Sequence, residues 1–195
     1  FVTHDHLDHN WPESIRRLRV ANRESLLLGP SEAAARWRTS RIPDANTRVV
    51  SAGDTGRVGS VAWHAVHAKP PAGDPDRGVG APDVEHLGFV LDFDGLRVWV
   101  CGDPINHFAE RDDLVGPVAA LMPGVAIVTN HPDEGEFPFF EGAWDAARRV
   151  GANVVIPAHY GCFRRRTYDP EAFAKLAPEG MECRVPPYGG EEVFA

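Results

Sequence analysis

The stretch THDHLDH, residues 3–9, places three histidines and two aspartates within seven positions near the start of the chain. Imidazole and carboxylate groups are the ligands that borderline divalent metals such as zinc prefer, and a single ion needs several of them together. Side chains alternate in direction along an extended segment, so His4 and His6 are expected to point the same way. Asp8 and His9 can turn toward the same space as the chain tightens into a helix. We therefore predict two pairs of metal ligands, His4 with His6 and Asp8 with His9.

The sequence NWPESIRRLRV, residues 10–20, predicts a helix directly after this cluster. Asn10 is a suitable N-cap and Pro12 suits a first helical turn. A helix N-terminus favours anionic groups, because its amides are unpaired and its dipole is positive there. The ordinary alternative is a polar surface turn. That alternative is disfavoured because three of the nine histidines fall within six positions.

The remainder of the chain alternates strand-like and helical patterns. The pair Asp94-Gly95 separates two β-rich runs, residues 86–93 and 96–103, and predicts a hairpin with a two-residue turn. This alternation favours an α/β layer arrangement with hairpins inside it. Further strands are expected at residues 25–29, 47–51, 60–68, 125–129 and 153–159, a Gly-Asp-Thr-Gly turn at residues 53–56, and further helices at residues 32–39, 141–151 and 170–177.

Length and composition predict one domain over residues 1–195, large enough to bury a core. The net charge of −8 argues against a general nucleic-acid or anionic-membrane surface, so a small-molecule substrate is the expected partner. Self-association into a homo-oligomer stays open. Three cysteines without a CxxC spacing favour a reducing, cytoplasmic setting. No apolar run approaches the roughly 20 residues of a membrane span.

The arrangement His4-x-His6-x-Asp8-His9 resembles the HxHxDH signature of the metallo-β-lactamase superfamily. Two later stretches support this resemblance, VWVCGD at residues 98–103 and VVIPAHY at residues 154–160. The resemblance implies an α/β fold, an αββα sandwich with a two-metal site at one edge. It also implies that Asp103 is the carboxylate that bridges both metals and that His159 is a ligand of the second metal.

Proteins of this superfamily normally carry another metal-binding histidine before the Gly-Asp motif, and the corresponding position here falls near Lys69. His64 and His67 are three positions apart, so on one strand they face opposite sides and at most one can enter the site. His86 lies at the base of the hairpin that delivers Asp103 and is the favoured substitute. His67 comes next, and a site with water or an aspartate at that place is the third alternative.

Members of the superfamily usually have several strands ahead of the HxHxDH segment, whereas only three residues precede it here. We therefore expect a metallo-β-lactamase-like sandwich that lacks its first N-terminal strands. The chain is then either an excerpt or a truncated form of the fold.

The resemblance implies a metal-dependent hydrolase with two divalent metal ions, Zn²⁺ or Mn²⁺, and a metal-activated water that cleaves an ester, lactone or phosphoester of a small molecule. Asp8 is the candidate catalytic residue, which orients this water. The stretches GFVLDFDGLRVWVCGD and GANVVIPAHYG are similar to the L-ascorbate-6-phosphate lactonase group and favour a sugar phosphate lactone. One alternative is a non-catalytic metal-binding homologue or scaffolding protein, and another is a redox protein with a di-iron site.

Four other features are weighed against ordinary structural roles. Cys101 is expected to be a buried thiol rather than a metal ligand, because free cysteines are usually buried. His107 can hold a ligand in orientation. The acidic loop at residues 133–136 is expected to be solvated. Residues 164–166 are three arginines that can hold a phosphate, although a solvated loop is the favoured interpretation.

Overall fold

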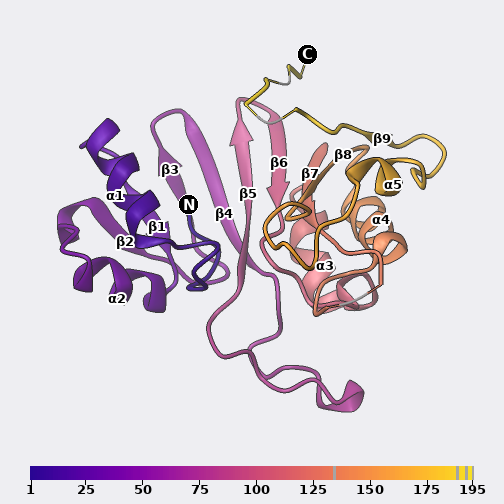
Figure 1. Ribbon diagram of the computed structural model, residues 1–195, viewed down its shortest axis with the longest axis horizontal. Coiled ribbons are helices and arrows are strands. Elements are labelled where there is room, and N and C mark those ends of the chain that lie inside the picture. Colours follow the sequence, from indigo (N-terminus) through magenta and orange to yellow (C-terminus); the bar gives the residue numbers. More distant parts are fainter. Residues whose placement is uncertain (134, 188, 192, 195) are drawn as a thin grey trace.

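Two β-sheets lie between two layers of helices in the computed structural model, which describes residues 1–133, 135–187, 189–191 and 193–194. Figure 1 shows α1 and α2 beside the small sheet, and α3, α4 and α5 beside the far end of the large sheet. The helices are α1 Pro12–Ala21, α2 Ser31–Thr39, α3 Asp112–Ala119, α4 Phe140–Val150 and α5 Pro170–Ala174. The strands are β1 Leu27–Gly29, β2 Thr47–Val49, β3 Thr55–Val58, β4 Val61–His67, β5 Leu87–Phe93, β6 Leu96–Val100, β7 Val125–Thr129, β8 Val154–Ala158 and β9 Glu182–Cys183.

The small sheet pairs β1 with β2 in parallel. Helix α2 covers it with an apolar face in which Trp37 is 1% exposed and Ala33 and Ala34 are buried. Burial of a side chain as large as Trp37 stabilises the fold by roughly 1.5–3 kcal/mol. These residues form one core with Val2, Leu27 and Ile42.

The large sheet has the order β3-β4-β5-β6-β7-β8-β9. The first four strands are antiparallel neighbours, and β6 to β9 run parallel. The predicted hairpin joins β5 to β6, and Asp94 and Gly95 both have positive φ, 55° and 104°. A two-residue turn needs this conformation to match the twist of its strands.

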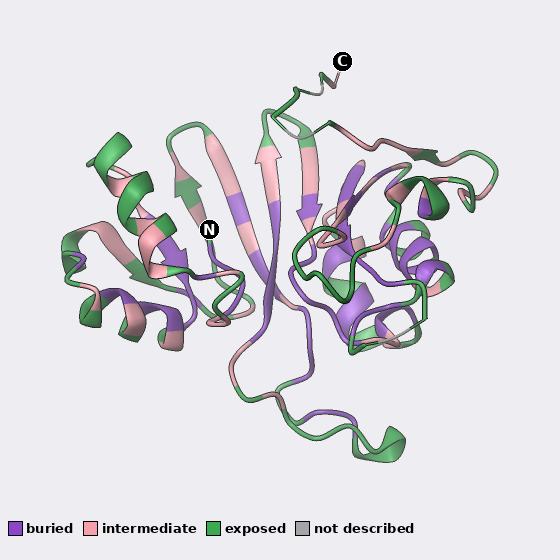
Figure 2. Ribbon diagram, in the orientation of Figure 1, coloured by how far each residue is buried: buried purple, intermediate pink, exposed green. Residues whose placement is uncertain are grey.

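Two further apolar cores hold the layers together. The core between the sheets contains Leu28, Val50, Trp63, Ala65, Leu87 and Phe89. The core between the large sheet and α3 and α4 is larger and includes Trp99, Phe108, Leu114, Val118, Trp144, Val150 and Phe173. Figure 2 shows that β5 is buried in its first half and becomes accessible toward the hairpin. The N-terminal half of β5 is therefore packed inside the fold, whereas the end next to the hairpin lies at the surface.

Residues 2 and 3 connect the two sheets. The Val2 amide donates to the carbonyl of Leu28 in the small sheet at 2.7 Å. The Leu87 amide at the start of β5 donates to the Thr3 carbonyl at 2.9 Å. This connection fixes the histidine cluster at the seam between the sheets.

Some element predictions were wrong at particular residues. Asn10 does not cap α1, which begins at Pro12 after an N-cap at Trp11 without a side-chain hydrogen bond. Asn10 is fully buried instead and accepts a hydrogen bond from Trp37 Nε1 at 2.8 Å. Strand β3 occupies positions where a turn was predicted, and α3 was not predicted at all.

Within the described residues, no helix is both long enough and apolar enough to cross a membrane.

Candidate metal centre

Three histidines form a first cluster, which consists of His4, His6 and His86. One ring nitrogen from each lies within 4.8 Å of the others. The rings of His4 and His86 stack at 4.1 Å with an interplanar angle of 23°. The hydrogen bond from the Leu87 amide to the Thr3 carbonyl explains this contact. It brings His4, which follows Thr3, next to His86, which precedes Leu87.

A second cluster contains Asp8, His9, Asp103 and His159, whose ligand atoms also lie within 4.8 Å of one another. Asp8 Oδ2 lies 3.1 Å from His159 Nε2 and 3.5 Å from His9 Nε2. The rings of His9 and His159 stack at 5.4 Å. The His9 ring also lies 4.0 Å from the His4 ring of the first cluster, so Asp8 and His9 turn toward the same space as His4 and His6.

Asp103 lies between the two clusters. Its Oδ2 atom is 3.5 Å from His4 Nε2 and 3.3 Å from His9 Nε2. Asp103 is 2% exposed, so its carboxylate is held inside the fold rather than in solvent. Asp103 is therefore within reach of histidines from both clusters.

The parallel strands bring the last two members together. Asp103 follows β6 and His159 follows β8, and the carboxyl ends of parallel strands meet at one edge of a sheet. β8 ends at Ala158, and His159 has a φ of 72°, in the left-handed region. The rings of Phe137 and Phe163 pack against His159 at 5.0 and 5.5 Å. Packing therefore holds His159 in a backbone conformation that few residues adopt.

Thr3 orients two of the histidines, a role that the sequence analysis missed. Its hydroxyl oxygen lies 3.0 Å from His4 Nδ1 and 3.4 Å from His9 Nδ1. When both Nδ1 atoms carry the proton and donate to this oxygen, the lone pairs of both Nε2 atoms point into the site. Residues that fix the tautomer in this way commonly support metal ligands.

The polar atoms in the centre of the site fit a cation. Buried polar atoms normally have hydrogen-bond partners. Several atoms of the clusters have none among the described residues. They are His4 Nε2, His9 Nε2, both ring nitrogens of His86, and Asp103 Oδ1. A set of inward-facing lone pairs on imidazole and carboxylate is the donor set of zinc and related divalent ions.

Electrostatics also favour the metal-binding forms of His4, His86 and Asp103. Burial lowers the pKa of His4 to about 2, and the neighbouring His9 and His86 lower it further. Burial, followed by Lys69, lowers the pKa of His86 to about 3. Burial alone would raise the pKa of Asp103, but its contact with His9 outweighs this effect and holds the pKa at about 2. Neutral imidazoles and a charged carboxylate are the forms that bind metal.

Asp5, the remaining acid of the opening stretch, points away from both clusters. Its Oδ1 accepts from Arg36 Nε at 2.5 Å and from Asn10 Nδ2 at 2.7 Å. Asp5 therefore anchors the stretch to helix α2. This direction agrees with the alternation expected for an extended segment.

The structure distinguishes between the candidates for the intermediate histidine. It brings His86 into the first cluster and places His64 and His67 outside both clusters. His64 and His67 both line another hollow with Thr55 and Pro117, and His67 also lines the hollow in which His86 lies. Neither of the two is a member of either cluster.

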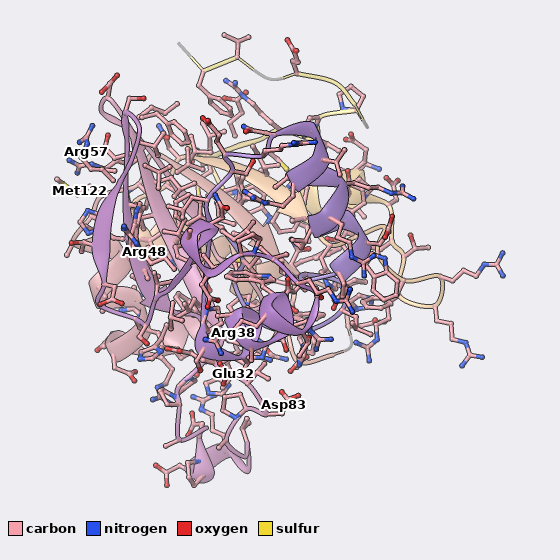
Figure 3. The ribbon with its side chains drawn as sticks, turned by 90° about the vertical axis from the view of Figure 1, so that its left-hand side faces the viewer. Glu32, Arg38, Arg48, Arg57, Asp83 and Met122 are labelled. Atoms are coloured by element: carbon pink, nitrogen blue, oxygen red, sulfur yellow. The ribbon has the colours of Figure 1, made fainter. Side chains whose placement is uncertain are left out.

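Asp83 is a further neighbour of the first cluster that the sequence analysis did not identify. Its two carboxylate oxygens lie 3.2 and 3.1 Å from His6 Nε2. Figure 3 shows Asp83 on the same lower edge of the molecule as Glu32 of α2, and both line one hollow with His86. Asp83 is 73% exposed at its side chain, so it can turn away when His6 Nε2 binds another group.

The other residues that were weighed have mixed outcomes. Cys101 is 1% exposed, and its sulfur accepts a hydrogen bond from the Thr129 amide at 3.1 Å. Burial raises the pKa of the Cys101 thiol to about 12. His107 does not touch the clusters, because its Nε2 pairs with Asp74 at 2.6 Å. Residues 164–166 are exposed.

The described acids of the acidic loop are exposed, as expected. Glu136 also pairs with the buried Lys69. Asp133 is exposed, and Glu134 lies outside the described residues.

Comparison with known proteins agrees with this geometry. The sequence model of the beta-lactamase superfamily domain matches residues 1–160, a range that includes both clusters. The chain therefore belongs to the metallo-β-lactamase superfamily.

The relatives give a narrower description. A UPF0173 metal-dependent hydrolase of Rubrobacter xylanophilus is 31% identical over 194 residues, which cover 94% of this chain and 73% of that protein. The homologues of this chain thus identify it as a metal-dependent hydrolase of this superfamily, which confirms the predicted enzyme class. None of this confirms the ascorbate-6-phosphate lactonase group, which stays a prediction.

Solved structures share the fold. Igni18, a metallo hydrolase of Ignicoccus hospitalis, superimposes with a TM-score of 0.71 at 21% identity and covers 98% of this chain and 76% of its own. An isothiocyanate hydrolase from Delia radicum gut bacteria gives a TM-score of 0.71 at 17% identity and covers 99% of this chain and 75% of its own. The predicted metallo-β-lactamase fold is confirmed.

Proposed function

We propose that this hydrolase cleaves an ester, lactone or phosphoester of a small molecule at two divalent ions, Zn²⁺ or Mn²⁺. The observation that carries the proposal is the convergence of unpartnered ligand atoms from segments far apart in the chain. In this proposal the first ion is held by His4, His6, His86 and Asp103. The second is held by Asp8, His9, Asp103 and His159.

Divalent ions at these positions would supply Lewis-acid chemistry, since they lower the pKa of a bound water and polarise a substrate oxygen. The protein supplies the geometry. Asp103 contributes a buried negative charge next to both clusters, and Thr3 holds two imidazoles with their Nε2 atoms inward. Neither a serine nor a cysteine nucleophile is needed for this reaction.

Asp8 is the group of the second cluster that is most open to solvent. Its side chain is 25% exposed, compared with 7% for His159 and 18% for His9. A carboxylate that faces both the cluster and the solvent can accept a hydrogen bond from the attacking water and take its proton. We assign this orienting role to Asp8.

The substrate within this class is a proposal at a finer level. The similarity to lactonases favours a lactone of a phosphorylated sugar, and the charge of −8 favours a small molecule over a nucleic acid or a membrane. A cytoplasmic location and a homo-oligomeric state stay predictions of the same kind.

The test combines metal analysis with hydrolysis assays. The purified protein is assayed on lactones and on bis(p-nitrophenyl) phosphate, with and without EDTA, and its metal content is measured by elemental analysis. We expect close to two ions per chain and hydrolysis that EDTA abolishes. His6→Ala and Asp103→Ala should each remove bound metal and activity together while the fold, followed by circular dichroism, is retained.

His64→Ala is the matched control, because His64 lies outside both clusters. This variant should keep the metal and the activity of the original protein. Full turnover in His6→Ala or Asp103→Ala would contradict the proposal. One ion or none, with no turnover on any substrate, would favour the alternative of a non-catalytic metal-binding homologue.

A further inference from the structure

A pocket of about 480 Å³ lies beside the first cluster, within the size range of small-molecule sites. Its apolar wall includes Pro70, Val79, Pro82 and Ile105. Among the described residues that line it, Lys69 is the only lysine or arginine. The pocket therefore combines an apolar surface with a single cationic group.

Lys69 is unusual because its side chain is only 8% exposed. A buried ammonium group is costly unless it is paired with an anion. Its partner is the carboxylate of Glu136, a side chain that is 54% exposed and comes from another loop of the pocket wall. A buried cation thus pairs with an anion that can return to solvent. An incoming carboxylate can replace such a partner, whereas the cation stays where it is.

The rest of the wall is fixed in place. The amides and carbonyls of Asp74 and Val79 pair in both directions, at 2.8 and 2.9 Å. The Asp74 carboxylate also binds His107 Nε2 at 2.6 Å and Arg111 Nη1 at 3.0 Å. Gly73 has a φ of 72°, and a Cβ atom there would lie 2.3 Å from the Gly80 carbonyl oxygen. The loop at residues 69–85 is therefore a built structure, and its side of the pocket exists without a ligand.

The pocket also borders the metal centre. Asp83 lies in its wall and contacts His6 Nε2 at 3.1 Å. Lys69, Pro82 and Asp83 also line the adjoining hollow in which His86 lies. The two carboxylates of the wall are already engaged, Asp83 with His6 and Glu136 with Lys69.

We propose that this pocket binds the substrate and that Lys69, after Glu136 moves aside, holds a carboxylate group of that substrate. The inference rests on the proposed function, since it places the cleaved bond near the first cluster. Within the proposed class of esters and lactones, it favours small substrates that carry an apolar segment and a carboxylate over the lactone of a phosphorylated sugar. Glu136 acts in the free protein as an internal competitor for the same cation.

The test uses two substitutions with opposite expected effects on carboxylate binding. Binding of glutarate to the metal-loaded protein is measured by isothermal titration calorimetry. Lys69→Met should weaken glutarate binding by about tenfold or more, because the charged partner is lost. Glu136→Gln should strengthen it several-fold, because the competing negative charge is removed. Lys175→Met and Glu179→Gln are matched controls at exposed positions and should bind glutarate as the original protein does.

A purely structural ion pair would give a different result, since both substitutions would then lower the melting temperature without opposite effects on glutarate. Unchanged glutarate affinity in either Lys69→Met or Glu136→Gln overturns the inference. Lys69→Arg keeps the positive charge and is used if Lys69→Met does not fold. Lys69→Arg should bind glutarate better than any folded variant with a neutral residue at position 69. Equal glutarate binding by the charged and the neutral variants also overturns the inference.

Hydrolysis distinguishes this inference from the proposed function. Mono-p-nitrophenyl glutarate and p-nitrophenyl pentanoate differ in a terminal carboxylate, and the original protein should prefer the former through a lower KM. Lys69→Met should remove that preference while its metal content stays unchanged. If Lys69→Met weakens and Glu136→Gln strengthens glutarate binding but neither ester is hydrolysed, the result supports the pocket and counts against the proposed function. If both esters are hydrolysed with equal KM, the result supports the proposed function and counts against the pocket.

Discussion

At the scale of single residues, Thr3 explains how His4 and His9 both point their Nε2 atoms into the candidate metal centre. Its hydroxyl oxygen is within reach of Nδ1 of both His4 and His9. A residue of this kind is absent from the signature itself, since the signature records ligand types and not the hydrogen bonds that orient them. Thr3 is a positioning residue.

Thr3→Val should lower metal affinity by about 10–100-fold, because the two imidazoles lose the acceptor that fixes their tautomer and orientation. The valine keeps the shape and the β-branching of the threonine. The measurement is competition for zinc with a chromophoric chelator. Thr3→Ser restores the hydroxyl and should bind zinc nearly as the original protein does. Equal affinity in the valine and serine variants would contradict the role assigned to Thr3.

The sequence alone predicts most of the candidate site, and it favours His86 over His67 without deciding between them. Spacing identifies His4, His6, Asp8 and His9, and the resemblance adds Asp103 and His159. The position of His86 depends on the hydrogen bond between Thr3 and Leu87, a long-range pairing that no local pattern reveals. Asp83 was missed for the same reason, because 77 positions separate it from His6.

At the scale of elements, the seam between the sheets depends on Gly102. This residue has a φ of 66°, and a Cβ atom there would lie 2.5 Å from the Leu87 carbonyl oxygen and 3.0 Å from Thr3 Cβ. The glycine therefore allows three segments to meet where β6 ends and Asp103 begins the site. No side chain can be added without separating them.

Gly102→Ala should lower the free energy of unfolding by about 1–3 kcal/mol or more, because it adds both a strained φ and a backbone clash. The same change should lower metal affinity, since the segments that carry His4, His86 and Asp103 are pushed apart. Both effects are measurable by urea unfolding and by metal competition.

Gly116→Ala is the control for this prediction. Gly116 lies in α3, and a Cβ atom there would meet nothing within 4 Å. Alanine is favoured over glycine inside a helix by up to about 1 kcal/mol, so this variant should be as stable as the original protein or more stable. A similar loss of stability in both variants would show that the seam has no special requirement.

The strongest local patterns predicted their elements well. The Asp94-Gly95 hairpin, β7 and α4 lie where the sequence places them. The errors have a common physical cause. Asn10 has the chemistry of an N-cap but is used in the core by Trp37, and β3 is a short exposed strand whose pattern resembles a turn. Tertiary contacts decided these positions.

At the scale of the whole molecule, burial of neutral histidines makes the metal-free protein sensitive to acid. Burial lowers the pKa of His4 to about 2 and of His86 to about 3, whereas both groups return to about 6.5 on unfolding. The unfolded chain therefore binds more protons below pH 6.5. Stability from these groups is present above that pH and is lost as the pH falls.

We expect the free energy of unfolding in EDTA to decrease between pH 7 and pH 5, by at most about 1.4 kcal/mol per pH unit for each group. His9 acts in the opposite direction. Burial alone would lower its pKa, but Asp103 and Asp8 raise it, so its contribution is present at low pH and is lost as the pH rises. His86→Gln should show a shallower decrease in urea unfolding than the original protein, and an equal or steeper decrease would contradict this account.

The two halves of the second cluster lie far apart in the sequence, since 151 positions separate Asp8 from His159. Ribosomal synthesis delivers the N-terminal pair long before its last companion emerges. A nascent chain can thus expose His4 and His6 early, but it cannot complete the second cluster until β8 has been made. In the proposed function, metal loading of that cluster therefore follows the synthesis of β8.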